Sequence, residues 1–373
     1  MVTMEISFEE VLAQKREIVW EEIKKYLEMQ KKFPSFCGVP KKYSSLADFH
    51  FQMVDEYPER RGKYIRPALV LLTAGAMGYP EKKAVRTAGA MQVSEDWILN
   101  HDDIMDNSLQ RRGKPALHQI YGKELAINAG DALHLLMWKI LKDNLEVVGQ
   151  KKGLEIIDEF YMMLSRTILG QAVENKWTQE NNLRLTNKDV LFISEGKTGY
   201  YSIAGPMRLG AILAGATKVQ LERLYEFGKV LGQCFQIVDD LLDLTSDFRG
   251  LKKQIGNDIY EGKRTIMLMH LLRTVRARPA RNASPSSACV AGGDRDRLIR
   301  ILGNTREEKT EMEVKWIIGK MKDYGSLEYG KKMAEKLANQ ALILFEKNLG
   351  FLKSQPARDQ LKAGINFILK RNY

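Results

Sequence analysis

The 373-residue sequence contains only three cysteines, Cys37, Cys234 and Cys289, and no two of them form a CxxC pair. This spacing argues against a zinc site built on cysteine and against a framework of disulfide bonds. Sparse, unpaired cysteine is typical of proteins that work in the reducing cytosol. We therefore expect a cytoplasmic protein.

Long apolar runs are also missing. No stretch approaches about 18 uninterrupted apolar residues, so the sequence predicts no transmembrane helix. Residues 1–22 carry acidic side chains where a secretory signal peptide would need an apolar core. We expect neither a membrane-spanning nor a secreted protein.

Nucleotide-binding loops are missing as well. The residues GKT at 196–198 resemble the end of a Walker A loop, but the first glycine of that motif would have to stand where Leu191 is. No GxGxxG sequence follows a predicted strand. The sequence therefore predicts no P-loop.

The net charge is +11, but the basic residues are spread over many segments. There is no arginine-rich arm and no basic run interleaved with aromatic residues, so nucleic acid is not favoured as a partner. A phosphorylated small-molecule substrate would explain the charge, and so would a lysine-rich solvated surface. Composition alone leaves both open.

Most of the sequence has the apolar periodicity of amphipathic helices, and alternating strand patterns are scarce. Ser7 and Glu10 form a capping-box pattern at the start of the first helix. Several helices are apolar almost all round, which indicates burial in a large helical assembly. We expect one all-α domain over residues 1–373, a single bundle of ten or more helices. The periodic stretches are 7–30, 65–78, 84–106, 124–144, 153–175, 188–214, 218–247, 262–275 and 328–348.

Residues 274–297 interrupt this pattern. Proline, serine, alanine, glycine and arginine dominate the segment, and no apolar face runs along it. Such a composition predicts a flexible loop inserted into the helical domain. An exposed insertion without a role is the simpler interpretation, and a lid or a partner-docking segment is the alternative.

Two acidic clusters stand out. Positions i, i+1 and i+4 of a helix that turns about 100° per residue share one arc, so each cluster is expected to line one side of its helix. A solvated acidic face would explain one cluster, but both are embedded in apolar sequence. All-carboxylate sites suit Mg²⁺ completed by water and phosphate oxygens. The clusters are Asp102, Asp103 and Asp106, and Asp239, Asp240 and Asp243.

Basic and hydroxyl side chains recur beside these clusters. Lys63 and Arg66 are three residues apart and are expected on one face of a helix start. Each basic residue alone is more typical of a solvated surface, but the set could cradle two anionic groups. The set is Lys63, Arg66, Arg111, Arg112, Lys197, Thr198, Lys253, Lys263 and Arg264. His101 precedes the first cluster but points off its arc, and we expect a structural role for it.

Seven ordered segments between residues 58 and 272 resemble the trans-isoprenyl diphosphate synthases. They are GKYIRP, HDDIMDNSLQRRGKPALH, NAGD, GQAVE, GKTGYY, FQIVDDLLD and GNDIYEGKRT. The resemblance implies an all-α bundle around a deep central cavity, usually in a homodimer. It also implies a prenyltransferase that joins an allylic diphosphate to isopentenyl diphosphate.

The resemblance assigns roles to these residues. The six aspartates would hold Mg²⁺, about three ions per active site by family resemblance, against the allylic diphosphate. Arg111, Lys197, Lys253 and Lys263 would contact that diphosphate, and Lys63, Arg66 and Arg112 would bind isopentenyl diphosphate. After the allylic C–O bond ionises, Gln236 and Thr198 would stabilise the cation, the isopentenyl double bond would attack it, and a proton would be lost to the departed diphosphate.

One position departs from the family pattern. The family often has histidine or glutamine seven residues before the first aspartate, and Glu95 stands there. A carboxylate would repel a diphosphate unless it pairs with a cation or points away. A non-catalytic partner subunit is therefore one alternative function. A class I terpene cyclase is another, although its second metal motif usually differs from DDLLD.

Product length is expected to depend on side chains one to two turns before Asp102. Trp97 is aromatic, its neighbour Ile98 is aliphatic, and Ser94 one turn deeper is small. This pattern resembles short-chain enzymes that make the C20 product geranylgeranyl diphosphate, with C15 as the nearest alternative. Simple core packing of Trp97 is the competing interpretation. A lipophilic product would also favour association with a membrane surface.

Overall fold

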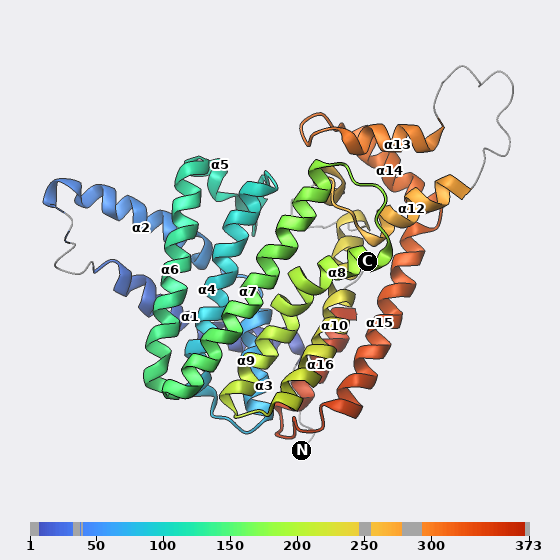
Figure 1. Cartoon of the computed structure of the whole chain (residues 1–373). Helices are drawn as coiled ribbons and strands as arrows, with labels where there is room; N and C mark the ends of the chain where they lie inside the picture. Colours follow the sequence, from blue (N-terminus) through green and yellow to red (C-terminus); the bar gives the residue numbers. More distant parts are fainter. Residues whose placement is uncertain (1–6, 33–37, 39, 246–254, 278–292, 370–373) are drawn as a thin grey trace, which may run out of the picture. The chain divides into compact units, whose positions relative to one another are not determined.

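The computed structural model describes residues 7–32, 38, 40–245, 255–277 and 293–369 (Figure 1). The chain divides into two compact units. Unit 1 comprises Met1–Met162, Ser202–Tyr225 and Glu346–Gly364, and unit 2 comprises Met163–Tyr201, Glu226–Phe345 and Ile365–Tyr373. Almost all described elements are helices, which confirms the all-α prediction. Among the described helices, none is both long and apolar enough for a bilayer crossing.

Unit 1 is built mainly on the pair α4 and α6, which pack along each other. Its elements are α1 (Phe8–Gln30), η2 (Lys41–Tyr43), α2 (Ser44–Glu59), α3 (Ile65–Ala76), α4 (Glu81–Met105), β1 (Gln110–Arg111), β2 (Lys114–Pro115), α5 (Leu117–Tyr121), α6 (Lys123–Val148) and α9 (Gly205–Leu213). The capping box at Ser7 and Glu10 is present as predicted. Helix α9 lies close against α3, because a Cβ at Gly210 would come within 2.4 Å of the Val70 carbonyl oxygen.

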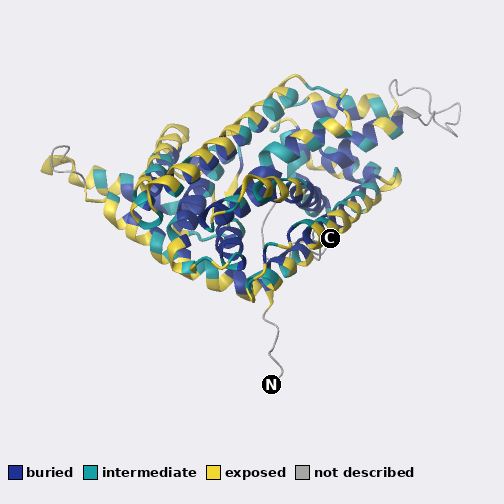
Figure 2. Cartoon of the chain, turned by 60° about the horizontal axis from the view of Figure 1, so that its bottom comes forward, coloured by how far each residue is buried: buried dark blue, intermediate teal, exposed yellow. Residues whose placement is uncertain are grey.

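In its described part, unit 2 contains five helices of its own: α8 (Asn187–Ile193), α11 (Asn257–Glu261), α12 (Ile266–Ala277), α13 (Asp294–Gly303) and α14 (Glu311–Asp323). The remaining elements have residues in both units. They are α7 (Gln150–Gln179), the π-helix η3 (Ser194–Ala204), α10 (Lys218–Thr245), α15 (Ser326–Asn348) and α16 (Ala357–Leu369). Within each unit the helices turn a buried side inward and an exposed side to solvent (Figure 2).

The helix predicted over 188–214 is confirmed in extent, since α8, η3 and α9 follow one another without a break over residues 187–213, but the π-helical segment η3 was not predicted. Pro206 stands in the first turn of α9, directly after the π-helix, where its missing N–H removes one backbone hydrogen-bond donor. In unit 2, Gly199 of η3 and Gly232 of α10 touch, because a Cβ at Gly232 would lie 2.2 Å from the Gly199 Cα. This contact fixes the wide turn that carries Lys197 and Thr198.

Two further boundaries differ from the sequence-based expectation. The helix predicted over 262–275 starts at Ile266, because Gly262 has a φ of +74° and closes α11 instead. The loop predicted over 274–297 is too long, since α12 reaches Ala277 and α13 begins at Asp294. Residues 278–292 lie outside the described residues.

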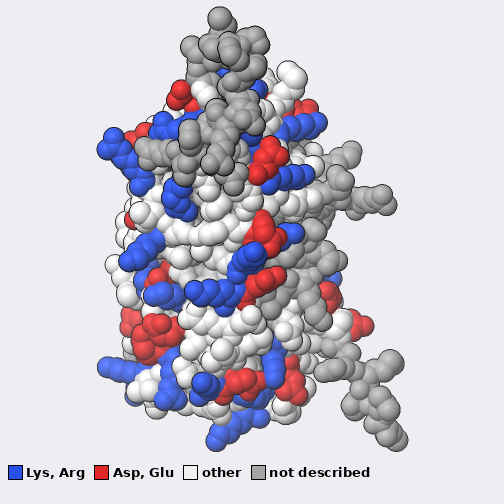
Figure 3. Space-filling model, turned by 90° about the vertical axis from the view of Figure 1, so that its right-hand side faces the viewer, with Lys and Arg blue, Asp and Glu red and all other residues white. Residues whose placement is uncertain are grey.

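Charge is well mixed on the face of unit 2 that carries α12 to α15. Figure 3 shows Lys and Arg interspersed with Asp and Glu there, without a large area of one sign. Ion pairs account for part of this pattern, such as Lys320 with Asp294 at 2.8 Å. The described residues of this face therefore form no extended basic surface of the kind that binds a nucleic-acid backbone.

Candidate active site

The first acidic cluster lies at the carboxyl end of α4 in unit 1. Asp102 and Asp103 belong to the last turn of the helix, and Asp106 is its C-cap. The Asp103 side chain is fully buried. It accepts hydrogen bonds from the Tyr57 hydroxyl and from Arg111, whose Nε lies 3.0 Å from both carboxylate oxygens. The structure therefore neutralises Asp103 with a protein cation.

A short hairpin places Arg111. Strands β1 and β2 pair antiparallel through a two-residue turn at Arg112 and Gly113, both with positive φ, as a type I′ turn requires. Arg60 fixes the hairpin by donating to the carbonyl oxygens of Arg111 and Pro115 at 3.2 and 2.8 Å. Burial by itself would lower the pKa of the Arg111 guanidinium. The charge of Asp103 and its hydrogen bond together have the larger effect, so the pKa is raised. The sequence pattern does not predict this hairpin, because its strands have only two residues each.

The residues predicted for isopentenyl diphosphate form a second polar cluster in unit 1. Glu95 Oε1 lies 3.2 Å from Arg66 Nη1 and 3.6 Å from Arg112 Nη2, and Arg112 Nη1 donates to Asp96 at 2.9 Å. Glu95 thus pairs with cations, one of the two arrangements that the sequence left open. Lys63 is exposed and precedes α3, so the helix face predicted for it with Arg66 is wrong.

Trp97 is 8% exposed and faces α6. Its ring stacks on His134 with centroids 4.1 Å apart, and its indole N–H donates to His101 Nδ1 at 3.3 Å. His101 also lies 3.3 Å from the carbonyl oxygen of Ile127, so its contacts are structural, as predicted. Ser94 is buried and Ile98 is partly exposed. His134 was missed, because a single histidine in an apolar helix gives no sequence pattern.

The second acidic cluster lies on the part of α10 that belongs to unit 2. Asp239 is exposed, Asp240 is buried and Asp243 is partly exposed. The Thr198 hydroxyl donates to Gln236 Oε1, and Gln236 Nε2 donates to Asp240 at 2.7 Å. Burial, followed by the charges of Asp258 and Asp239, raises the pKa of Asp240 well above its ordinary value. The sequence-predicted Thr198, Gln236 and Asp240 are therefore one hydrogen-bonded chain.

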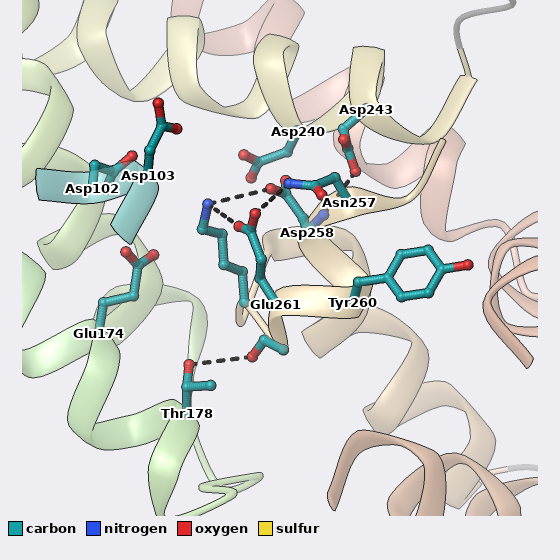
Figure 4. A network of polar contacts seen from close by, with 12 residues as sticks. Asp102, Asp103, Glu174, Thr178, Asp240, Asp243, Asn257, Asp258, Tyr260 and Glu261 are labelled. Carbon is teal, nitrogen blue, oxygen red and sulfur yellow. Dashed lines mark hydrogen bonds and ion pairs between the residues drawn. The ribbon is translucent and has the colours of Figure 1, made fainter. Parts of the chain in front are cut away.

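Helix α11 adds acidic residues that the sequence analysis did not single out (Figure 4). Asp243 accepts the backbone N–H of Asp258 at 3.0 Å, which ties α11 to α10. Lys263 pairs with Asp258 at 3.6 Å and with Glu261. The motif GNDIYEGKRT contains both carboxylates, although the resemblance predicts only its lysine as a diphosphate contact.

Two further predicted cations of unit 2 that the structure describes, Lys197 and Arg264, differ in their surroundings. Lys197 pairs with Glu174 at 2.7 Å. Arg264 donates to backbone carbonyl oxygens, among them that of Asn182 at 3.1 Å, and these contacts give it a structural role. Burial lowers the pKa of its guanidinium to about 10. Lys253 lies outside the described residues. A pocket in unit 2 is lined by, among others, Glu174, Lys197, Thr198, Gln236, Asp240 and Lys263.

The donor chemistry fits Mg²⁺, because the candidate ligands are carboxylate oxygens. Among the residues that the structure describes, no three metal-binding side chains converge tightly enough to hold an ion by themselves. Mg²⁺ commonly takes one or two carboxylates and completes its shell with water and substrate phosphate. These clusters therefore fit a magnesium site that forms together with a phosphorylated ligand.

Comparison with known proteins gives consistent matches. Residues 48–291 match the family described as polyprenyl synthetase. A short chain isoprenyl diphosphate synthase from Methanothermobacter thermautotrophicus is 32% identical, covering 84% of this chain and 87% of that protein. A geranylfarnesyl diphosphate synthase from Natronomonas pharaonis is 28% identical, covering 98% of both. The crystal structure of geranylgeranyl pyrophosphate synthetase from Pyrococcus horikoshii superposes with a TM-score of 0.76 at 26% identity, covering 98% of this chain and 99% of that one.

Proposed function

Because the chain belongs to the polyprenyl synthetase family, it is a short-chain prenyltransferase, and we propose that its product is geranylgeranyl diphosphate. The reaction class rests on the pair of acidic sequences DDIMD and DDLLD, which end α4 and lie on α10 with cationic residues around each. The proposed product length rests on Trp97, the aromatic side chain that precedes the first of them. The product named for the Pyrococcus relative supports C20. The Natronomonas relative is named for geranylfarnesyl diphosphate, a C25 product. C25 is therefore an alternative product length to be tested, beside C15.

The allylic diphosphate is the proposed ligand of both acidic clusters. Asp102, Asp103, Asp106, Asp239, Asp240 and Asp243 would hold about three magnesium ions with it, by resemblance to the family. Bound magnesium supplies Lewis-acid neutralisation of the leaving diphosphate, which favours ionisation of the allylic C–O bond. Arg111, Lys197 and Lys263 are already ion-paired with carboxylates, so they would exchange or share these partners with phosphate oxygens. Lys253 belongs to the same proposed set.

The hydrogen-bonded chain from Thr198 through Gln236 to Asp240 supports two roles. It orients the Asp240 carboxylate from one side, because the Gln236 amide N–H points at one oxygen. The oxygen atoms of Thr198 and Gln236 would also stabilise the allylic cation by their dipoles. Both hydrogen bonds are already present in the structure without a ligand, and preorganised dipoles of this kind stabilise charge that develops in a transition state.

The second substrate is proposed to lie at Lys63, Arg66 and Arg112 of unit 1. Their guanidinium and ammonium groups suit the diphosphate of isopentenyl diphosphate. The isopentenyl double bond would attack the allylic cation, forming one C–C bond, and the departed diphosphate would accept the proton that is lost. No protein nucleophile is needed in this scheme.

Assembly and location are further parts of the proposal. Exposed apolar side chains on α6, among them Leu125, Ile127 and Leu135, support a homodimer. Sparse cysteine supports the cytoplasm, and a lipophilic product supports contact with a membrane surface.

The test is an incubation with Mg²⁺, labelled isopentenyl diphosphate, and dimethylallyl, geranyl or farnesyl diphosphate in turn. We expect a dominant C20 product when the dephosphorylated products are separated by chromatography. A C15 or C25 product would correct the length and keep the reaction class. Conversion of an allylic diphosphate without isopentenyl diphosphate would favour a class I terpene cyclase. No incorporation by folded protein would favour the non-catalytic partner subunit.

A further inference from the structure

Glu95 occupies an unusual place in unit 1. Its carboxylate lies between the guanidinium groups of Arg66 and Arg112, and Oε1 is within ion-pair distance of both. Arg66 Nη2 also donates to the Ser202 hydroxyl at 2.7 Å. One protein anion therefore bridges the two arginines to which the proposed function assigns the isopentenyl diphosphate.

The charges in this cluster cancel. Arg66 and Arg112 bring two positive charges, and Glu95 and Asp96 bring two negative ones. Asp96 is fully buried and committed to Arg112 and to the Gln92 amide, which donates to it at 3.2 Å. Glu95 is the outer carboxylate, with a side chain that is 12% exposed. Within these four side chains, net positive charge for a diphosphate therefore requires that Glu95 move away, and the proposed Lys63 would add to it.

Polar atoms in the same cluster point to a second, ligand-bound arrangement. Glu95 Oε2, Arg112 Nη2 and the Tyr64 hydroxyl are buried and make no hydrogen bond. Tyr64 is 1% exposed and lies in the electrostatic field of Asp96, Arg112 and Glu95. Buried donors without acceptors are costly. An anionic oxygen in place of the Glu95 carboxylate would satisfy the donors of Arg112 and Tyr64.

We infer that Glu95 is an internal competitor of the isopentenyl diphosphate: it holds Arg66 and Arg112 together in the free protein, and the substrate diphosphate displaces it. The inference rests on the proposed function of this cluster. Because the substrate must replace a bound anion, Glu95 sets the KM for isopentenyl diphosphate high and leaves the allylic substrate unaffected. Glu95 is thus a specificity-determining residue for one of the two substrates.

The test compares Glu95→Gln with the wild type. Glutamine keeps the size of the side chain, removes its charge and adds an N–H donor for phosphate. We expect the KM for isopentenyl diphosphate to fall about tenfold, while kcat and the KM for the allylic substrate change by less than about twofold. Calorimetric titration with isopentenyl diphosphate alone should show the same gain in affinity.

Two variants serve as controls. Glu22→Gln removes a carboxylate of the same 12% exposure that pairs with Arg86 of α4 at 3.0 Å, and it should leave the KM unchanged. Glu95→Asp keeps the charge and should keep the high KM. Thermal unfolding of each variant establishes that it is folded, and Glu95→Ser provides a smaller neutral residue if the glutamine variant does not fold.

The outcomes separate the inference from the proposed function. If the wild type incorporates isopentenyl diphosphate but Glu95→Gln has an unchanged or higher KM, Glu95 positions the arginines and the inference is overturned. An equal fall in the KM for isopentenyl diphosphate in Glu22→Gln would also overturn the inference. The fall would then follow from the net charge of the protein and not from the position of Glu95. If the wild type incorporates no isopentenyl diphosphate with any allylic starter, the proposed function fails and the inference falls with it.

Discussion

Arg111 Nε donates to both carboxylate oxygens of Asp103, at 3.0 Å to each. The Asp103 side chain is fully buried, and the Tyr57 hydroxyl donates to it as well. Burial and the nearby Asp103 charge raise the pKa of Tyr57, so the phenol stays protonated and remains a donor. Asp103 thus anchors the hairpin to α4, a structural role that adjacent Asp102 does not share to the same degree.

Replacing Arg111 should lower the free energy of unfolding of the protein. Arg111→Met leaves the buried Asp103 carboxylate without its cation, which costs about 3–5 kcal/mol of unfolding free energy. Denaturant unfolding measures this loss. Arg16→Met is the control, because Arg16 pairs with Glu17 on the surface and its loss should cost about 1 kcal/mol or less. Equal losses in the two variants would contradict a special role for the Arg111–Asp103 pair.

The Gln236 amide should matter for catalysis more than for folding. Gln236→Met removes the link between Thr198 and Asp240, so the carboxylate loses its orienting donor. We expect kcat to fall about 10- to 100-fold, since a misplaced charged group weakens transition-state stabilisation. Gln233→Met is the matched control one turn earlier on α10, where the amide donates to the Leu191 carbonyl oxygen. Similar kcat values for both variants would refute the prediction.

Asp96 should make stability fall as pH rises through the acidic range. Burial raises its pKa from 3.8 to about 6, although Arg112 opposes this. Between these values the folded protein holds a proton that the unfolded chain has released, so stability present below pH 3.8 is lost by about pH 6. Two pKa units correspond to about 3 kcal/mol. The difference in unfolding free energy between wild type and Asp96→Asn should fall by about this amount over the window. A pH-independent difference would contradict the assignment.

Trp97 should limit product length. Trp97→Ala removes the ring that stacks on His134 at the level where the growing chain is proposed to end. We expect products longer than those of the wild type, with a stability loss of about 3–5 kcal/mol from the cavity. Chromatography of the dephosphorylated products measures the length. Trp316→Ala on α14 is the control, because Trp316 contacts Arg297 and Lys320 on unit 2. Unchanged product length in Trp97→Ala would leave Trp97 as simple core packing.

Much of the secondary structure was predictable because it depends on local sequence. Ser7 and Glu10 cap α1 as expected, since both partners of a capping box lie within four residues. The π-helical segment within 188–214 was not predictable, because it lies where Gly199 meets Gly232, a contact between residues far apart in the chain. The hairpin at 110–115 was missed for a related reason: its stability comes from Arg60 and Asp103, not from strand periodicity.

The sequence by itself determined the residue types of the site: the two acidic motifs, their cations and the neutral amide and hydroxyl beside them. Helical spacing brought each acidic motif to one side of its helix, because that relation needs only the helix repeat. Only the tertiary structure decided which charges pair. Arg111 turns to Asp103, Glu95 bridges Arg66 and Arg112, and Asp243 binds the backbone of Asp258. Ion pairing depends on distance and burial, and these are set when separate segments pack.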